Sequence, residues 1–106
     1  MIEIAKKLAE RFKYLEKVEF YLEKIKEIVR SFDNSAEVYV FGSFLRAENL
    51  PSSDIDVLIC SNRIEEFRTA ILSKVYEELG YMHPFEIHMV DENGFRWYKK
   101  FEMKRI

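Results

Sequence analysis

The chain has 106 residues, 48% of them hydrophobic and 34% charged, and its formal net charge at pH 7 is −2. This length suits a single modest core, so residues 1–106 are predicted to form one domain. The slightly acidic balance argues against general nucleic-acid binding, which normally requires a basic face. The single cysteine, Cys60, excludes a disulfide within the chain and favours a cytoplasmic location. Neither a signal peptide nor a membrane-spanning run is expected.

Residues 1–32 are predicted to form an N-terminal helical segment, either one long amphipathic helix or two helices with a bend. Leu8, Leu15, Leu22 and Val29 recur every seven residues, and charged side chains fill the opposite side. A straight helix of this length would span about 48 Å, which exceeds a domain of this size. We therefore expect its first half to project past the domain or to fold back, and to offer a surface to a partner or a second copy.

The remaining residues, 36–106, are predicted to form an α/β (α+β) core in which helices pack on a small mixed β-sheet. The expected elements are strand 36–41, a turn and short helix at 42–48, strand 54–60, helix 63–79, strand 85–90, a turn at 91–94 and a last helix over 95–106. Gly80 is expected to stop the helix before it. Within the last helix, Tyr98 is expected to face the core and Trp97 to pack at its rim.

Two aspartates open the strand predicted over 54–60. Side chains alternate along a strand, so Asp54 and Asp56 should share one face, where their like charges repel. A cation between them would relieve that repulsion, and Mg²⁺ is usually held by one or two carboxylates together with substrate phosphates. Taken alone, the pair is better interpreted as two solvated aspartates at a strand end, because paired acidic residues are common.

A Gly-Ser turn precedes this pair. Gly42 ends an apolar strand and allows a ligand to approach the backbone closely. Ser43 is expected to begin a short helix, whose free N–H groups attract phosphate. Arg46 lies one turn further on and could reach a phosphate or hold the following loop. Ten residues separate Ser43 from Asp54, and the combination within a strand–helix–strand context indicates a nucleotide site.

With these residues the chain resembles a minimal nucleotidyltransferase (MNT) of the DNA polymerase β-like superfamily. Gly42, Ser43, Asp54 and Asp56 match the superfamily pattern of Gly-Ser, ten residues and Asp-x-Asp. Arg46 matches an arginine that is frequent three residues after the serine. The resemblance implies a nucleotidyltransferase fold like the palm of polymerase β.

The match is most direct over residues 37–60. Within this range, the sequence differs from the family pattern at one position. Ala47 stands where the family commonly has glycine, which loosens the turn but touches no ligand.

A third carboxylate often comes from a later strand in this superfamily, and the resemblance assigns that place to Glu86, as a metal ligand or a base. Aspartate is more common there, and a solvated strand glutamate is the alternative. His88 should share the face of Glu86, where it could support Glu86, carry a proton or be a hydrogen-bonded core histidine. His83 precedes Pro84 and is expected to face solvent.

The resemblance implies transfer of a nucleoside monophosphate, expected to be AMP from ATP, to a hydroxyl group. The three carboxylates would bind one or two Mg²⁺ ions, and the Gly-Ser turn and the arginine would bind the phosphates. MNT proteins are commonly antitoxins that attach AMP to a tyrosine of a HEPN-domain toxin, so the resemblance implies a HEPN toxin as partner.

Two other functions stay open from the sequence. One is a binding-only antitoxin with a weak nucleotide site. The other is a small-molecule nucleotidyltransferase of the antibiotic-modifying kind, acting as a homodimer through residues 1–32.

Overall fold

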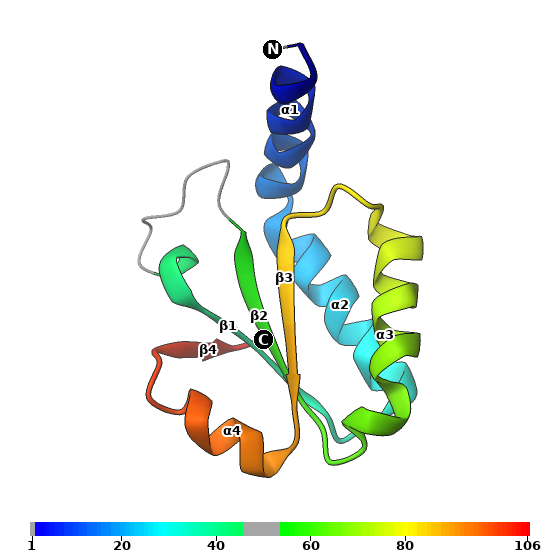
Figure 1. Cartoon of the computed structure of the whole chain (residues 1–106), viewed down its shortest axis with the longest axis vertical. Coiled ribbons are helices and arrows are strands. Elements are labelled where there is room, and N and C mark those ends of the chain that lie inside the picture. The colour runs from blue at the N-terminus through cyan, green and yellow to red at the C-terminus, as the bar shows by residue number, and fades with distance from the viewer. Residues whose placement is uncertain (1, 46–53) are drawn as a thin grey trace.

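The computed structural model of the chain describes residues 2–45 and 54–106 (Figure 1). Its elements, in chain order, are helices α1 (Ile2–Glu16) and α2 (Val18–Phe32), strand β1 (Glu37–Phe41), the short 3₁₀ helix η1 (Gly42–Phe44), strand β2 (Ile55–Cys60), helix α3 (Ile64–Leu79), strand β3 (Phe85–Val90), helix α4 (Glu92–Tyr98) and strand β4 (Met103–Arg105). The predicted class, a small mixed sheet with helices packed on it, is confirmed.

The four strands form one sheet in the order β3-β2-β1-β4. Strand β1 pairs antiparallel with both β2 and β4, whereas β2 pairs parallel with β3. A parallel pair needs a long crossover, and α3 provides it between β2 and β3. Strand β2 is therefore central, which agrees with its apolar, β-branched composition.

The two faces of the sheet carry different side chains because residues alternate along each strand. One face packs against α2 and α3 and forms the main core. Its buried strand residues include Val38, Val40, Val57, Ile59 and Met89, and its buried helix residues include Ile25, Val29, Ile71 and Val75. The opposite face carries Asp56 and is covered in part by α4.

The N-terminal segment forms two helices, as one of the two alternatives predicted. The helical run breaks at Lys17, whose φ and ψ are −122° and 32°. Figure 1 shows α2 lying along the sheet and α1 projecting beyond it. The hydroxyl of Tyr14 donates a hydrogen bond of 2.5 Å to the carbonyl of Leu79, which ties the end of α1 to the end of α3. None of the helices within residues 2–45 and 54–106 combines the length and hydropathy that a membrane crossing needs.

The C-terminal prediction was wrong in two respects. Residues 91–94 are not a turn between elements, because Asp91 caps α4 and accepts a hydrogen bond of 2.9 Å from the backbone N–H of Gly94. The last helix ends at Tyr98 instead of running to residue 106, and β4 then pairs with β1. Trp97 is 57% exposed, and its ring lies 4.9 Å from that of Tyr98 and 5.4 Å from that of Phe101.

The buried carboxylate of Asp33 links the turn after α2 to the turn after β2. Asp33 accepts hydrogen bonds from the hydroxyl of Ser61 at 2.5 Å and from the hydroxyl and N–H of Ser35 at 2.7 and 3.0 Å. The bond from Ser61, followed by those from Ser35, lowers the pKa of Asp33 below its ordinary value of 3.8. Because the folded-state pKa is depressed, the charged form stabilises the fold above pH 3.8, and this stabilisation is lost as the pH falls through the folded-state pKa.

Replacing Asp33 by asparagine should therefore destabilise the protein at neutral pH and matter less in acid. We expect a loss of about 1–3 kcal/mol in the free energy of unfolding at pH 7, the range for hydrogen bonds to a charged group. Urea unfolding at pH 7 and at pH 3 measures the difference. Asp91→Asn is the matched control, because asparagine caps a helix about as well as aspartate. An Asp33→Asn deficit that is equally large at both pH values would contradict the assignment.

Candidate active site

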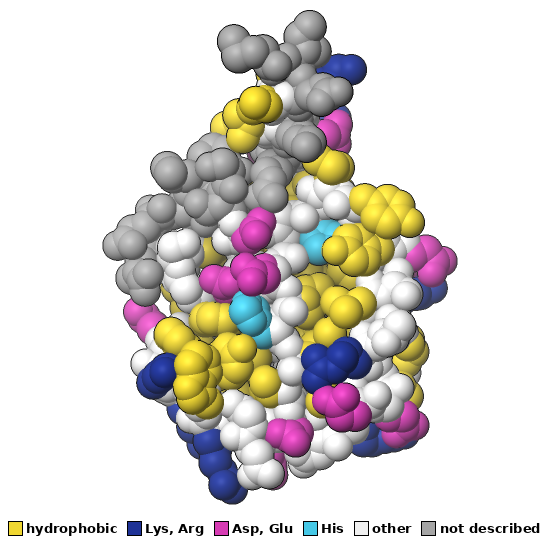
Figure 2. Space-filling model, in the orientation of Figure 1, with side chains coloured by type: hydrophobic (Ala, Val, Ile, Leu, Met, Phe, Trp, Pro, Cys, Tyr) yellow, Lys and Arg dark blue, Asp and Glu magenta, His cyan; other side chains and the backbone are white. Residues whose placement is uncertain are grey.

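The parallel pairing of β2 with β3 brings two predicted site residues together. Asp56 is the register partner of Glu86, so their side chains emerge side by side on the same face of the sheet. The side chain of Asp56 is 27% exposed and that of Glu86 is 56% exposed. Figure 2 shows acidic side chains gathered beside a histidine on this face. Carboxylates on adjacent strands, open to solvent, can bind a cation that is shared with a substrate.

His88 belongs to the same cluster. Alternation along β3 predicted only that His88 shares the face of Glu86. Its Nε2 atom lies 3.2 Å from Oδ1 of Asp56 and 3.8 Å from Oε1 of Glu86. Its Nδ1 atom lies 3.3 Å from the hydroxyl of Tyr98, on α4. Tyr98 is the site residue that sequence reasoning missed, because its place depends on how α4 crosses the sheet.

The side chains present fit a divalent cation. One ligand atom each from Asp56, Glu86 and His88 lie within 4.8 Å of one another, and two of the three are carboxylate oxygens. Hard divalent cations prefer oxygen ligands, and imidazole nitrogen is a common metal ligand. Asp54 stands outside this group of three ligand atoms.

Asp54 lies one residue before β2 and is exposed. It lines a cavity of about 320 Å³ together with Glu86, and Tyr76 and His83 form part of its wall. Glu86 thus borders both the metal-ligand cluster and this cavity, while Asp54 borders the cavity. Their roles as ligands stay predictions.

The Gly-Ser turn packs directly on Asp56. Gly42 has a φ of +83°, and a Cβ atom at this position would lie 2.5 Å from Oδ2 of Asp56. Only glycine satisfies both the left-handed backbone and this close approach. Ser43 lies inside η1 and not at its beginning, and the short helix expected over 42–48 is seen as η1 at 42–44. Arg46, the third predicted phosphate-binding residue, lies outside the described residues.

An aromatic cluster packs against the ring of His88. The ring of Phe41, which is buried at the end of β1, lies 5.1 Å from the ring of His88 and 5.6 Å from that of Tyr98. The ring of Phe101 lies 5.7 Å from that of Phe41 and 6.1 Å from that of Tyr98. The end of β1 therefore contributes the ring that contacts His88, and the first residue of η1 is the glycine beside Asp56.

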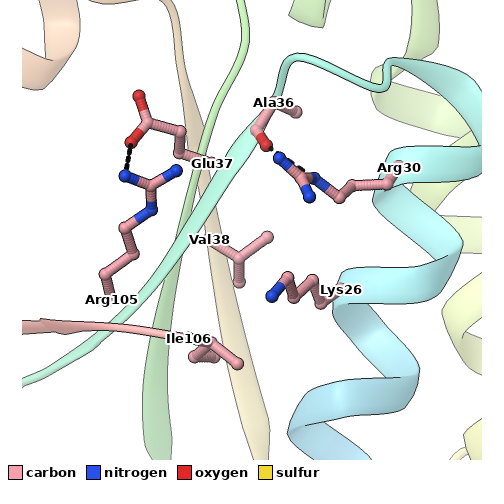
Figure 3. A pocket seen from close by; sticks show the side chains of 7 residues that line it. All are labelled: Lys26, Arg30, Ala36, Glu37, Val38, Arg105 and Ile106. Carbon is pink, nitrogen blue, oxygen red and sulfur yellow. Dashed lines mark hydrogen bonds and ion pairs between the residues drawn. The ribbon is translucent and has the colours of Figure 1, made fainter.

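A second cavity, near β4, is smaller and is lined in part by basic side chains (Figure 3). It measures about 50 Å³, and its lining includes Lys26, Arg30 and Arg105. The Arg105 guanidinium lies 3.2 Å from a carboxylate oxygen of Glu37, and Nε of Arg30 donates to the carbonyl of Ala36 at 3.3 Å. This volume is about that of one or two water molecules, so the cavity is too small for a nucleotide.

Replacing Gly42 by alanine should damage both the fold and the ion site. We expect the free energy of unfolding to fall by at least about 1–2 kcal/mol, the cost of a left-handed conformation for a residue with a Cβ atom. Urea unfolding gives this value, and calorimetric titration of a divalent cation reports on Asp56. Gly80→Ala is the matched control, because Gly80 has a φ of +94° and its added Cβ would meet the Tyr14 hydroxyl. Unchanged cation binding by the Gly42 variant would contradict the coupling.

Asp56 should be dispensable for folding. Asp56→Asn removes one of the charges that repel one another in this cluster, so without metal its free energy of unfolding should stay within about 1 kcal/mol of the intact chain. Leu58→Ala, at a fully buried position of the same strand, should instead cost about 2–5 kcal/mol. Chemical denaturation compares the two variants. An Asp56→Asn protein that unfolds would show that the aspartate is structural.

Comparison with known proteins places the chain in a family. A solved structure provisionally assigned as a nucleotidyltransferase is 27% identical, with a TM-score of 0.65, over 79% of this chain and 95% of that chain. A second, of a Sulfolobus solfataricus protein with the same provisional assignment, is 26% identical, with a TM-score of 0.56, over 92% of this chain and 84% of that chain. No curated protein matches the chain. The family model for the nucleotidyltransferase domain matches residues 22–105. The chain therefore belongs to the nucleotidyltransferase domain family.

Proposed function

We propose that this domain transfers AMP from ATP to a hydroxyl group in a Mg²⁺-dependent reaction, and that the acceptor is a tyrosine of a HEPN-type toxin. Nucleotidyl transfer as the general reaction follows from the family. The observation that carries the proposal is the packing of Gly42 against Asp56, with Glu86 beside them on the next strand. This arrangement puts a backbone turn suited to phosphates next to carboxylates suited to a cation.

Asp54, Asp56 and Glu86 would hold the cation. When bound, Mg²⁺ neutralises charge that develops on the phosphate oxygens during transfer. Asp56 and Glu86 sit on β2 and β3, so the sheet would keep these two ligands in place before substrate arrives.

The Gly-Ser turn would orient the triphosphate. Backbone N–H groups at the start of η1 can donate to the β- and γ-phosphates. This placement would direct the α-phosphorus toward the carboxylates.

The chemical step would form one bond and break one bond. The acceptor oxygen attacks the α-phosphorus, the bond from that phosphorus to the bridging oxygen breaks, and pyrophosphate leaves with that oxygen. Glu86 would receive the proton of the acceptor hydroxyl, directly or by way of the metal site, since it is the most exposed member of the cluster and borders the cavity of about 320 Å³.

A protein acceptor is favoured by the surface of the N-terminal helices. Ile4, Phe12 and Phe20 are each at least half exposed on α1 and α2. Large apolar side chains that stay exposed on a helix can contribute to a protein–protein contact. We propose that this surface holds the partner while its tyrosine reaches Glu86.

Two measurements test the proposal. Calorimetric titration of ATP, with and without Mg²⁺, into the intact chain and into the Asp54→Asn, Asp56→Asn protein should show magnesium-dependent binding that the double variant loses. Incubation with ATP labelled at the α-phosphate should then transfer label to a cognate HEPN protein, and replacing the acceptor tyrosine by phenylalanine should abolish the transfer.

Each contrary result has a definite meaning. If the double variant neutralises the toxin as well as the intact chain does and no label is transferred, the domain is a binding-only antitoxin. If label passes to a small-molecule acceptor without any protein partner, the domain is a small-molecule nucleotidyltransferase.

A further inference from the structure

We infer that His88 is itself a metal ligand through Nε2, and that the Asp56–Glu86–His88 cluster therefore binds Mn²⁺ or a later first-row dication more tightly than Mg²⁺. The inference rests on the proposed function only in assuming that the site binds a divalent cation. It concerns which ion is bound and by which atoms, and neither the nucleotide nor the acceptor enters the argument.

The spacing of the ligand atoms suits a shared cation. Nε2 of His88 lies 3.2 Å from Oδ1 of Asp56 and 3.8 Å from Oε1 of Glu86. Neighbouring ligands around an octahedral ion with bonds of about 2.1 Å lie about 3 Å apart. The separation from Asp56 is thus close to the one that such an ion would impose, whereas the separation from Glu86 is longer and would need a rotation of this exposed side chain.

The surroundings of the other ring nitrogen favour ligation. A metal-bound histidine almost always donates its second N–H to an oxygen acceptor, which orients the ring. The hydroxyl of Tyr98 lies 3.3 Å from Nδ1 and can accept that hydrogen. With Nδ1 protonated in this way, the lone pair of Nε2 faces two carboxylates, and a cation between them makes that arrangement favourable. Without the ion, a proton on Nε2 donated to Asp56 satisfies the same atoms.

The ring of His88 is also held in place by an aromatic neighbour. Phe41 contacts it at a centroid distance of 5.1 Å, and the side chain of His88 is 26% exposed. A histidine that merely faced solvent would not be packed on one side by an aromatic ring and bonded at both nitrogens. Tyr98 and Phe41 act here as positioning residues, since they contact His88 and not the ion.

A nitrogen ligand changes the preferred ion. Mg²⁺ is hard and is held by oxygen, whereas first-row transition ions accept imidazole and bind it more tightly along the series from Mn²⁺ to Cu²⁺. Two carboxylates and one imidazole, contributed by Asp56, Glu86 and His88, form such a mixed set. Mg²⁺ would use the two carboxylates alone, so loss of His88 should affect the two ions unequally.

The test uses the intact chain and Mn²⁺, without nucleotide or acceptor. Pulsed electron paramagnetic resonance of bound Mn²⁺ should show coupling to an imidazole nitrogen. His88→Phe should lose this coupling and weaken Mn²⁺ binding by about tenfold or more, while Mg²⁺ affinity changes less. His83→Gln is the matched control, because the chain has two histidines and His83 stands outside the cluster. It should keep the nitrogen signal.

Tyr98→Phe gives a second measurement that does not depend on replacing His88. Removing the Nδ1 partner should weaken Mn²⁺ binding by about tenfold while the nitrogen coupling persists. The inference is overturned if Mn²⁺ does not bind the intact chain at millimolar concentration, if bound Mn²⁺ shows no imidazole coupling, or if His88→Phe binds both ions as the intact chain does. AMP transfer observed alongside any of these results would leave the proposed function standing and remove only the role of His88.

Discussion

The parallel pairing of β2 with β3 is the constraint on which the site depends. Its register sets Asp56 directly beside Glu86, and a shift of one residue would turn one of them into the core formed with α2 and α3. That register is held by buried apolar side chains on the opposite face, such as Ile55, Val57 and Ile59. The acidic residues contribute repulsion to the folded state, and the hydrophobic face stabilises the arrangement against it.

Strand β1 couples the two halves of the site. Phe41 packs under His88, and the next residue, Gly42, lies against Asp56 with a backbone that only glycine adopts readily. The turn proposed for phosphates and the carboxylate proposed for the cation therefore cannot move independently. A site built in this way is positioned before its ligands bind, which reduces the reorganisation that binding requires.

Local patterns in the sequence were enough to predict most of the sheet and its acidic residues. Strands 54–60 and 85–90 match β2 and β3 closely, since alternating or continuous apolar residues bounded by polar ones are a local signal. The C-terminal region failed for the opposite reason. Asn93 and Gly94 resemble a turn but lie in a capped helix, and Met103–Arg105 has no strand signature and is a strand only because it pairs with β1.

The early end of the last helix and the missed site residue have one origin. Tyr98 reaches His88 because α4 is short and its last turn lies over Phe41, and α4 ends there because the chain must return to pair β4 with β1. If the helix ran to residue 106, β4 could not form and nothing would end the helix at Tyr98. Features that depend on this long-range closure are invisible to periodicity, whereas Asp56 and Glu86 follow from the strands that carry them. The ring orientation of His88 is thus set by tertiary packing, and it depends on the positions of α4 and β4.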